Sequence, residues 1–155
     1  MDRFIVKNLV VLSLIAGGIL GLFAPIPYLG TVILFTVLFL IAPLVMVYMI
    51  MDGKFDVVEV KNSIIAGAIT GFSVNFSFSF VYALMMVILA KVFKYSSNFF
   101  LTSMIINSPF WLLFVFVAFI GVLFATTNAF SGFLTYYVIN FIRDNYEKQH
   151  NNEEK

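Results

Sequence analysis

The sequence has no cysteine, a single histidine and few charged residues, and each shortage excludes a class of protein. Without cysteine there is no disulfide, no thiolate metal site and no thiol nucleophile. Charged residues make up 11% of the 155 positions, against about 25% in soluble domains. The net charge of +1 offers no basic surface for nucleic acid and no acidic surface for a cationic partner.

Apolar residues make up most of what remains. They account for 62% of the chain, and the mean hydropathy is +1.04. A chain of this length usually forms one domain. The composition therefore predicts an all-α, polytopic integral membrane protein, with a single domain over residues 1–155 and the lipid bilayer as its surroundings.

Three long stretches carry no charged side chain: positions 8–51, 62–90 and 95–142. Each exceeds the roughly 20 residues that a transmembrane helix needs. The first stretch is broken by Pro25 and Pro27, which remove backbone donors and favour a turn. The prediction is a four-helix transmembrane bundle with helices at 8–24, 29–51, 62–90 and 109–142, and a polar tail at 143–155.

Two prolines and one polar cluster affect where the predicted helices bend, begin or divide. Pro43 lies inside the second predicted helix and is expected to kink it. Residues 99–107 are expected in the membrane interface, before a helix that begins at Ser108 and Pro109. In an alternative, a turn at positions 126–128 divides the last stretch and gives five helices. That turn leaves too few residues before Arg143 for a comfortable crossing, so four helices are favoured.

The distribution of cations predicts the orientation. Four crossings place the amino terminus, the Asp52–Lys61 loop and the carboxyl tail on one side. Cytoplasmic segments are enriched in lysine and arginine. Both termini are therefore expected in the cytoplasm, with the protein in the cell membrane. The predicted cytoplasmic side holds Arg3, Lys7, Lys54, Lys61, Arg143, Lys148 and Lys155, and the opposite side holds Lys91 and Lys94.

The first and third predicted helices share a pattern of small residues. Shifting the chain by 50 positions aligns two copies of Ser-x-x-x-Gly-x-x-x-Gly. Small residues at this spacing let neighbouring helices approach closely, so both patterns predict packing faces. Either two helical hairpins arose by duplication, or apolar helices simply reuse few residue types. The predicted packing residues are Ser13, Gly17, Gly21, Ser63, Gly67 and Gly71.

No ionisable residue lies inside the predicted spans, which limits the chemistry available there. Proton-coupled carriers, voltage sensors and intramembrane metalloproteases normally need such groups. Outside the spans, the spacing of Asp52, Asp56 and Glu59 does not match a calcium loop, so we interpret them as a solvated face. We therefore predict no catalytic residue, cofactor or metal site, and expect that the protein is not an enzyme.

Polar side chains inside the spans are the remaining candidates for function. On the third helix, small and polar residues share one face, while Phe72, Phe76 and Phe80 occupy the other and are expected to face lipid. Asn75 and Asn128 are expected at similar depth, because each lies 14 or 15 residues from a cation at the cytoplasmic edge. The favoured interpretation is that they bond each other and hold the helix register, and the alternative is that they line a solute path. The intramembrane polar residues of interest are Thr70, Asn75, Ser77 and Asn128.

Two functions are compatible with this pattern. The favoured hypothesis is a non-enzymatic module that packs through its glycine faces, against a second copy of itself or another membrane protein. The alternative is a small pore or carrier for a neutral or weakly polar solute, which would use the face around Asn75.

Overall fold

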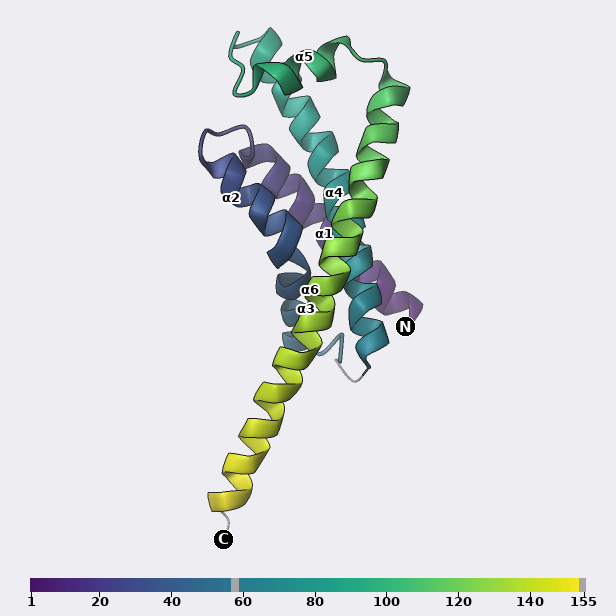
Figure 1. The fold of residues 1–155 in the computed structure, drawn as a ribbon, viewed down its shortest axis with the longest axis vertical. Helices are drawn as coiled ribbons and strands as arrows, with labels where there is room; N and C mark the ends of the chain where they lie inside the picture. Colours follow the sequence, from purple (N-terminus) through teal and green to yellow (C-terminus); the bar gives the residue numbers. More distant parts are fainter. Residues whose placement is uncertain (57–58, 154–155) are drawn as a thin grey trace.

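The computed structural model describes residues 1–56 and 59–153, and within them every regular element is a helix (Figure 1). Four helical stretches are long and apolar enough to cross a membrane, which confirms the all-helical prediction. In chain order the elements are α1 (Arg3–Phe23), α2 (Leu29–Phe35), the π-helical segment η1 (Thr36–Leu40), α3 (Ile41–Met51), α4 (Val60–Lys91), α5 (Phe99–Asn107) and α6 (Phe110–Glu153).

Two helices extend further than the sequence predicted. α1 begins at Arg3 instead of position 8, because long cationic side chains can reach water while their backbone stays helical. α6 runs for 44 residues, about 66 Å at 1.5 Å per residue, and ends well beyond the predicted end at 142. The sequence after Arg143 is polar but contains no glycine or proline that would end a helix.

The five-helix alternative is wrong, because α6 is continuous through the proposed turn at positions 126–128. The hydroxyl of Thr126 donates to the carbonyl of Val122 at 2.9 Å, and that of Thr127 donates to Leu123 at 2.9 Å. Threonine hydroxyls that bond back to the preceding turn in this way are compatible with a helix. The stretch therefore contains one long helix after the short helix α5.

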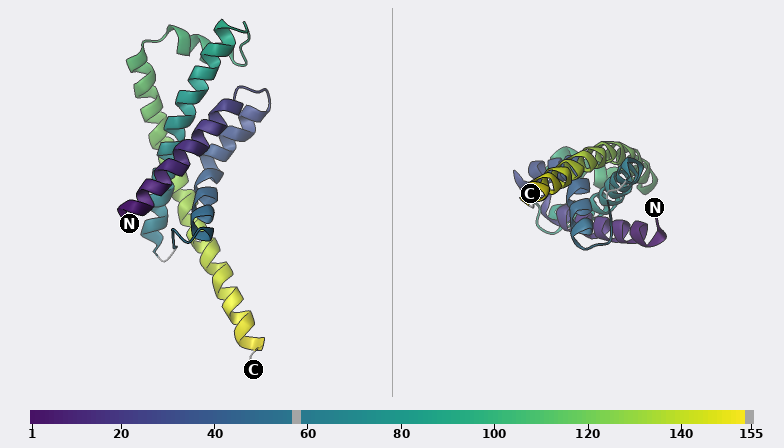
Figure 2. Two further views of the ribbon diagram at one scale, coloured as in Figure 1. Left: turned by 180° about the vertical axis from the view of Figure 1, so that it is seen from behind. Right: turned by 90° about the horizontal axis from the view of Figure 1, so that it is seen from below.

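α4 is the central helix of the bundle (Figures 1 and 2). α1 packs along one side of α4 and runs in the same direction, whereas α6 packs along another side and runs antiparallel. The interrupted helix α2–η1–α3 also packs against α4, and it contacts α6 through η1 and α3. Every long helix is thus in contact with α4.

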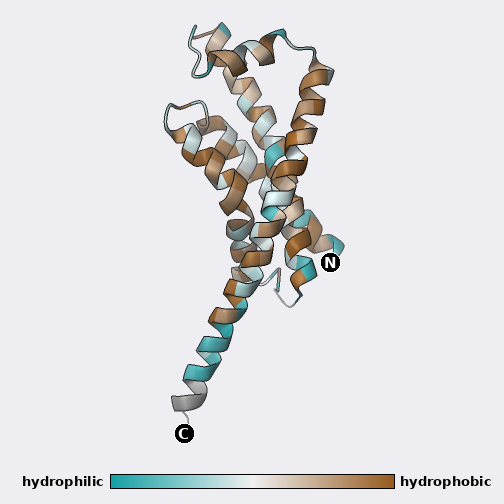
Figure 3. Cartoon of the chain, in the orientation of Figure 1, coloured by the Kyte–Doolittle hydropathy of each residue, from teal (hydrophilic) through white to brown (hydrophobic). Residues whose placement is uncertain are grey.

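Different elements lie at the two ends of the bundle, and α6 extends beyond one of them. The amino terminus and the α3–α4 connection lie at one end, here called the N-terminal end, and the α1–α2 connection and α5 lie at the other, the α5 end (Figure 1). α6 continues past the N-terminal end, where its residues become hydrophilic (Figure 3). There Arg143 pairs with Asp56 of the α3–α4 connection at 3.1 Å. Lys155, counted among the cations, lies outside the described residues.

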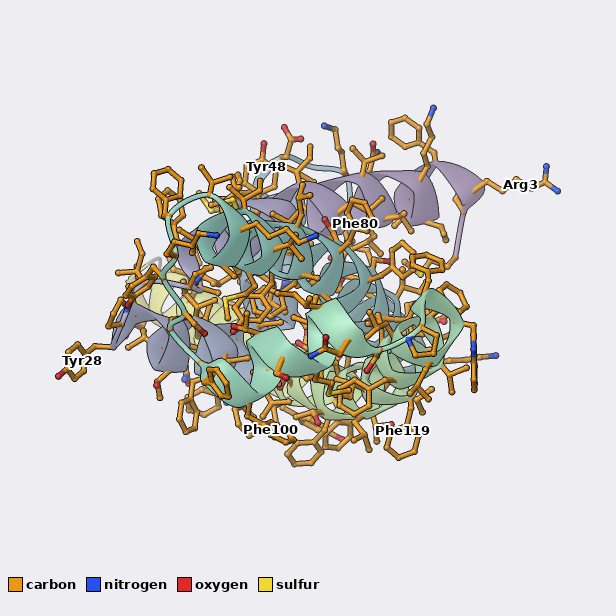
Figure 4. All side chains as sticks on the ribbon, turned by 90° about the horizontal axis from the view of Figure 1, so that it is seen from above. Arg3, Tyr28, Tyr48, Phe80, Phe100 and Phe119 are labelled. Carbon is orange, nitrogen blue, oxygen red and sulfur yellow. The ribbon has the colours of Figure 1, made fainter. Side chains whose placement is uncertain are left out.

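The sides of the bundle are covered with large apolar side chains. Seen from the α5 end, Tyr28, Tyr48 and Phe119 project from the edges of the molecule (Figure 4). Phe72, Phe76 and Phe80 of α4 are also exposed, as expected for a lipid-facing stripe. Monomeric soluble proteins rarely expose apolar surface on this scale, so the surface is compatible with a multi-pass membrane protein.

α5 spans the gap between the ends of α4 and α6 (Figure 1). The side chain of Asn98 caps its first turn by accepting a hydrogen bond from the Leu101 backbone N–H at 3.0 Å. Phe99 and Phe100 are exposed, and Thr102 is buried. This helix corresponds to the segment that the sequence predicted for the membrane interface.

Candidate functional site

The glycines of α1 lie against the backbone of α4. A Cβ atom built on Gly17 would overlap the carbonyl oxygen of Val74, and one on Gly21 would lie 2.8 Å from the carbonyl oxygen of Phe78. Ser77 of α4 donates a 2.6 Å hydrogen bond back to the carbonyl of Leu14. The two helices therefore touch backbone to backbone.

The glycines of α4 lie in the same way against α6. A Cβ atom on Gly67 would overlap the carbonyl oxygen of Asn128, and one on Gly71 would overlap that of Phe124. α6 contributes a glycine of its own, Gly132, which meets the carbonyl oxygen of Ser63. Gly132 was not predicted as a packing residue, although it lies four residues after Asn128 and could have been found by the same small-residue spacing.

Both predicted glycine faces are therefore covered by helices of this chain. The first stripe meets a parallel helix and the second an antiparallel one, so their partners are not equivalent. A second copy or another membrane protein could reach these glycines only by displacing an internal helix. Among the described residues, neither of these two glycine stripes is left free for assembly with another chain.

Three small polar side chains accompany these contacts. Ser13 and Thr70 are fully buried, and their hydroxyls have no hydrogen-bond partner among the described residues. The register of Gly17 on Val74 places Ser13 opposite Thr70 at the α1–α4 contact. Ser63 donates weakly to the carbonyl of Glu59 at 3.5 Å. These groups fit close packing, and none is directed at a base or an acid.

Asn128 bridges an interruption in the second apolar helix. In η1 the Ile41 N–H bonds to Thr36, five residues back, which leaves the carbonyl of Val37 without its usual partner. Asn128 Nδ2 donates to the carbonyls of Val37 at 3.0 Å and Leu38 at 3.2 Å. Its Oδ1 accepts from the Ala42 N–H at 3.2 Å. One buried amide therefore satisfies backbone groups that the break would leave unpaired.

The interruption lies just before Pro43, where the sequence predicted a kink. Proline has no N–H, so the carbonyl four residues earlier loses its helical partner and the helix is weakened there. α2 and α3 run in different directions on the two sides of η1 (Figures 1 and 2). The sequence signalled the kink through Pro43, but the π-helical turn and its partner Asn128 were not predicted.

Asn75 lies elsewhere and has different partners. It is 2% exposed, its Nδ2 donates to the carbonyl of Val117 at 3.1 Å, and its Oδ1 accepts from the Ser79 hydroxyl at 3.4 Å. A side-chain amide has two donors and an oxygen with two lone pairs. One donor and one lone pair of Asn75 thus remain unused.

The prediction that Asn75 and Asn128 lie at one depth and bond each other is wrong. Asn75 lies beside Gly121, seven residues before Asn128, which is about 10 Å along α6. The prediction measured depth from Arg143, but α6 extends beyond the end of α4, so Arg143 and Lys61 do not mark the same level. The two amides stabilise different helix contacts.

A cavity of about 450 Å³ lies next to Asn75, toward the α5 end. α4 forms its back wall, α2 and α6 form its sides, and α5 covers its top. Its polar groups on α4 are Asn75, Ser79 and Tyr82, and the described residues that line it include no charged side chain. Tyr82 stacks on Phe78 with ring centroids 5.8 Å apart, and its hydroxyl makes no hydrogen bond to the described residues.

This cavity is the best candidate for a functional site. Its volume falls within the roughly 300–1,000 Å³ of small-molecule pockets, and its few polar groups on an apolar lining are typical of them. Amide, hydroxyl and phenol groups can orient a ligand by hydrogen bonds. Asn75 was predicted from the sequence, but Ser79 and the cavity were not, because a cavity depends on how far helices diverge.

The acidic residues of the α3–α4 connection form no metal site. Asp52 pairs with Lys54, Asp56 pairs with Arg143, and Glu59 accepts a hydrogen bond from Asn62 at 3.3 Å. The hydrogen bond and charge of Asp52 raise the pKa of Lys54. Among the described residues, no group of three or more histidine, aspartate or glutamate side chains could hold a metal ion.

Compared with known proteins, the chain matches no family model, no curated protein and no solved structure. Its function is therefore argued from its own contacts.

Proposed function

We propose that this is a multi-pass cell-membrane protein that binds and carries a small neutral or weakly polar molecule. The observation that supports this is the cavity of about 450 Å³ beside Asn75, with hydrogen-bonding groups on one wall and no charge among the described residues that line it. A buried amide with an unused donor and lone pair is costly unless something satisfies it. A neutral ligand with a hydroxyl or carbonyl group would do so.

This proposal replaces assembly through the glycine faces as the favoured function. Those glycines contact the backbones of α4 and α6 inside the chain, so they explain close packing without a partner. Neither glycine pattern lines the cavity. A homo-oligomer or a complex with another membrane protein stays a prediction, and it would have to use other surfaces.

The proposed orientation can be tested with single cysteines, because the natural chain contains none. Both termini in the cytoplasm would place the α1–α2 connection and the start of α5 outside. A membrane-impermeant maleimide applied to intact cells should therefore label Tyr28→Cys and Ser97→Cys but not Lys148→Cys. Labelling of Lys148→Cys in intact cells would reverse the assignment.

The proposed binding site predicts a selective loss in Asn75→Leu. We expect the variant to lose at least tenfold in binding or flux of neutral molecules, since tenfold corresponds to about 1.4 kcal/mol, one buried hydrogen bond. Its stability should fall by only about 1 kcal/mol, because the contact with Val117 is a single interhelical bond. Glycerol flux into proteoliposomes and dodecanol binding in nanodiscs cover water-soluble and membrane-dissolved neutral ligands.

Asn140→Leu is the matched control for this experiment. Its amide bonds only to the carbonyl of Tyr136 in its own helix, at 3.0 Å, and it does not line the cavity. It should leave both measurements unchanged. If the wild type neither transports glycerol nor binds dodecanol, or if both asparagine variants behave alike, the proposed function is wrong.

A further inference from the structure

On one side, the cavity is lined by side chains of α2 and α6 that are also exposed at the surface of the bundle. α6 packs against η1 and α3, and it diverges from α2 toward the α5 end (Figure 1). Leu34 of α2 and Phe116 of α6 both line the cavity, and they are 48% and 43% exposed. In a membrane, these two apolar side chains would form the edges of an opening toward the lipid tails.

The part of α5 that lines the cavity is apolar. α5 covers the top of the cavity with the apolar side chains of Leu101, Met104 and Ile105. Of the nearby polar groups, Asn98 Oδ1 caps α5 and the Ser97 hydroxyl donates to the Met86 sulfur at 3.4 Å, while Tyr28 and Thr31 are exposed at the surface. Unused hydrogen-bonding groups lie deeper, on the α4 wall. Entry from the side reaches them without crossing α5.

The chemistry of the lining excludes charged ligands. An ion in a low-dielectric site without a partner costs several kcal/mol, and no charged side chain occurs among the described lining residues. The unused donor and lone pair of Asn75 suit a hydroxyl group, which both donates and accepts. Most of the remaining lining is apolar and suits a hydrocarbon chain.

The volume indicates how much of a ligand can lie inside the cavity. At about 30 Å³ per non-hydrogen atom, the share of a water molecule in the liquid, 450 Å³ holds roughly 15 such atoms. A two-chain phospholipid is much larger. A single chain of about 12 carbons with a terminal hydroxyl has few enough non-hydrogen atoms to lie inside the cavity.

From these observations we infer that the ligand is a neutral single-chain alcohol or a closely similar lipid, which enters from the bilayer between α2 and α6. Its hydroxyl bonds to Asn75 and Ser79 on α4, and its chain lies along the apolar side of α6. This inference rests on the proposed function, because it names the ligand class of the same cavity.

The ligand class can be tested with a dodecanol that carries a photoactivatable diazirine in its chain. In phosphatidylcholine nanodiscs, it should crosslink to the lining segments of α4 and α6 in the wild type. Unlabelled dodecanol should compete at least tenfold better than dodecanoate or dodecylamine. Crosslinking should fall at least tenfold in Asn75→Leu and stay unchanged in Asn140→Leu and Phe76→Leu, which lie outside the cavity.

The entry route can be tested with Ser79→Cys. A cysteine there should react with membrane-soluble N-cyclohexylmaleimide and at least tenfold more slowly with a charged sulfonated maleimide. Tyr28→Cys, which is exposed at the α5 end, should react readily with both. If the sulfonated maleimide reacted equally fast with the cysteines of Ser79→Cys and Tyr28→Cys, entry from the bilayer would be overturned.

The outcomes separate the inference from the proposed function. Glycerol flux that depends on Asn75, without crosslinking by dodecanol, would overturn the inference and leave the proposed function standing. Suppose instead that unlabelled dodecanol and dodecanoate reduce crosslinking equally and that Asn75→Leu does not change it. Bulk lipid would then fill the cavity. Together with an absence of glycerol flux, that result would overturn both.

Discussion

Replacing Asn128 with leucine is expected to destabilise the protein more than replacing Asn75 or Asn140 with leucine. Leucine has a similar size but cannot bond to Val37, Leu38 or Ala42, so buried backbone groups around η1 lose their partners. Each unsatisfied group costs about 1–3 kcal/mol, and the sum should reach about 3 kcal/mol or more. Thermal unfolding of the purified protein in detergent would show this as a lower melting temperature.

Two further variants make the Asn128 experiment specific. Asn140→Leu removes an amide that bonds within its own helix, and it should change stability by less than about 1 kcal/mol. The double variant Asn75→Leu with Asn128→Leu should show additive losses to within about 0.5 kcal/mol, because the two sites share no partner. A small effect of Asn128→Leu would show that η1 does not depend on this amide.

Replacing Gly67 with leucine is expected to prevent normal folding. A Cβ atom alone would already overlap the carbonyl oxygen of Asn128, and backbone atoms cannot rotate out of the way. Separating α4 from α6 would also break the bonds of Asn128 to η1. Overpacking commonly costs about 1–3 kcal/mol even where side chains can adjust, so we expect a larger loss here. Size-exclusion chromatography of the detergent-solubilised protein should show little monodisperse material.

The neighbouring glycines of α1 provide matched controls for such a steric effect. A Cβ atom on Gly17 would overlap the Val74 backbone, whereas one on Gly18 would approach only the side chains of Ser77, at 3.3 Å, and Val81, at 3.9 Å. Gly17→Ala should therefore be much more destabilising than Gly18→Ala. Phe76→Leu, on the exposed stripe of α4, should be mild. Equal tolerance at Gly17 and Gly18 would contradict the close α1–α4 contact.

The two amides illustrate different uses of a polar side chain within an apolar bundle. Asn128 is fully engaged by backbone groups of η1 and α6, so its expected effect is on stability. Asn75 has one interhelical bond and unused capacity beside a cavity, so its expected effect is on binding. Their residue types are identical, and only their surroundings separate the two roles.

The number of long apolar helices and the approximate positions of most of their ends could be predicted from the sequence. Hydrophobic stretches, prolines and charged residues act over a few residues along the chain, so their effects can be predicted locally. The same local periodicity placed Phe72, Phe76 and Phe80 on an exposed face of α4. The predicted end at 142 failed because the polar residues that follow include no glycine or proline that would end a helix.

The partner of each helix face could not be predicted in this way. Helical periodicity identifies a face, but the partner, the direction of that partner and the level at which helices cross depend on contacts between distant residues. The meeting of Asn128 with η1 joins positions about 90 residues apart, and the cavity depends on the divergence of α4 from α6. Neither depends on any local pattern, which is why Asn75 and Asn128 were wrongly paired and the cavity was missed.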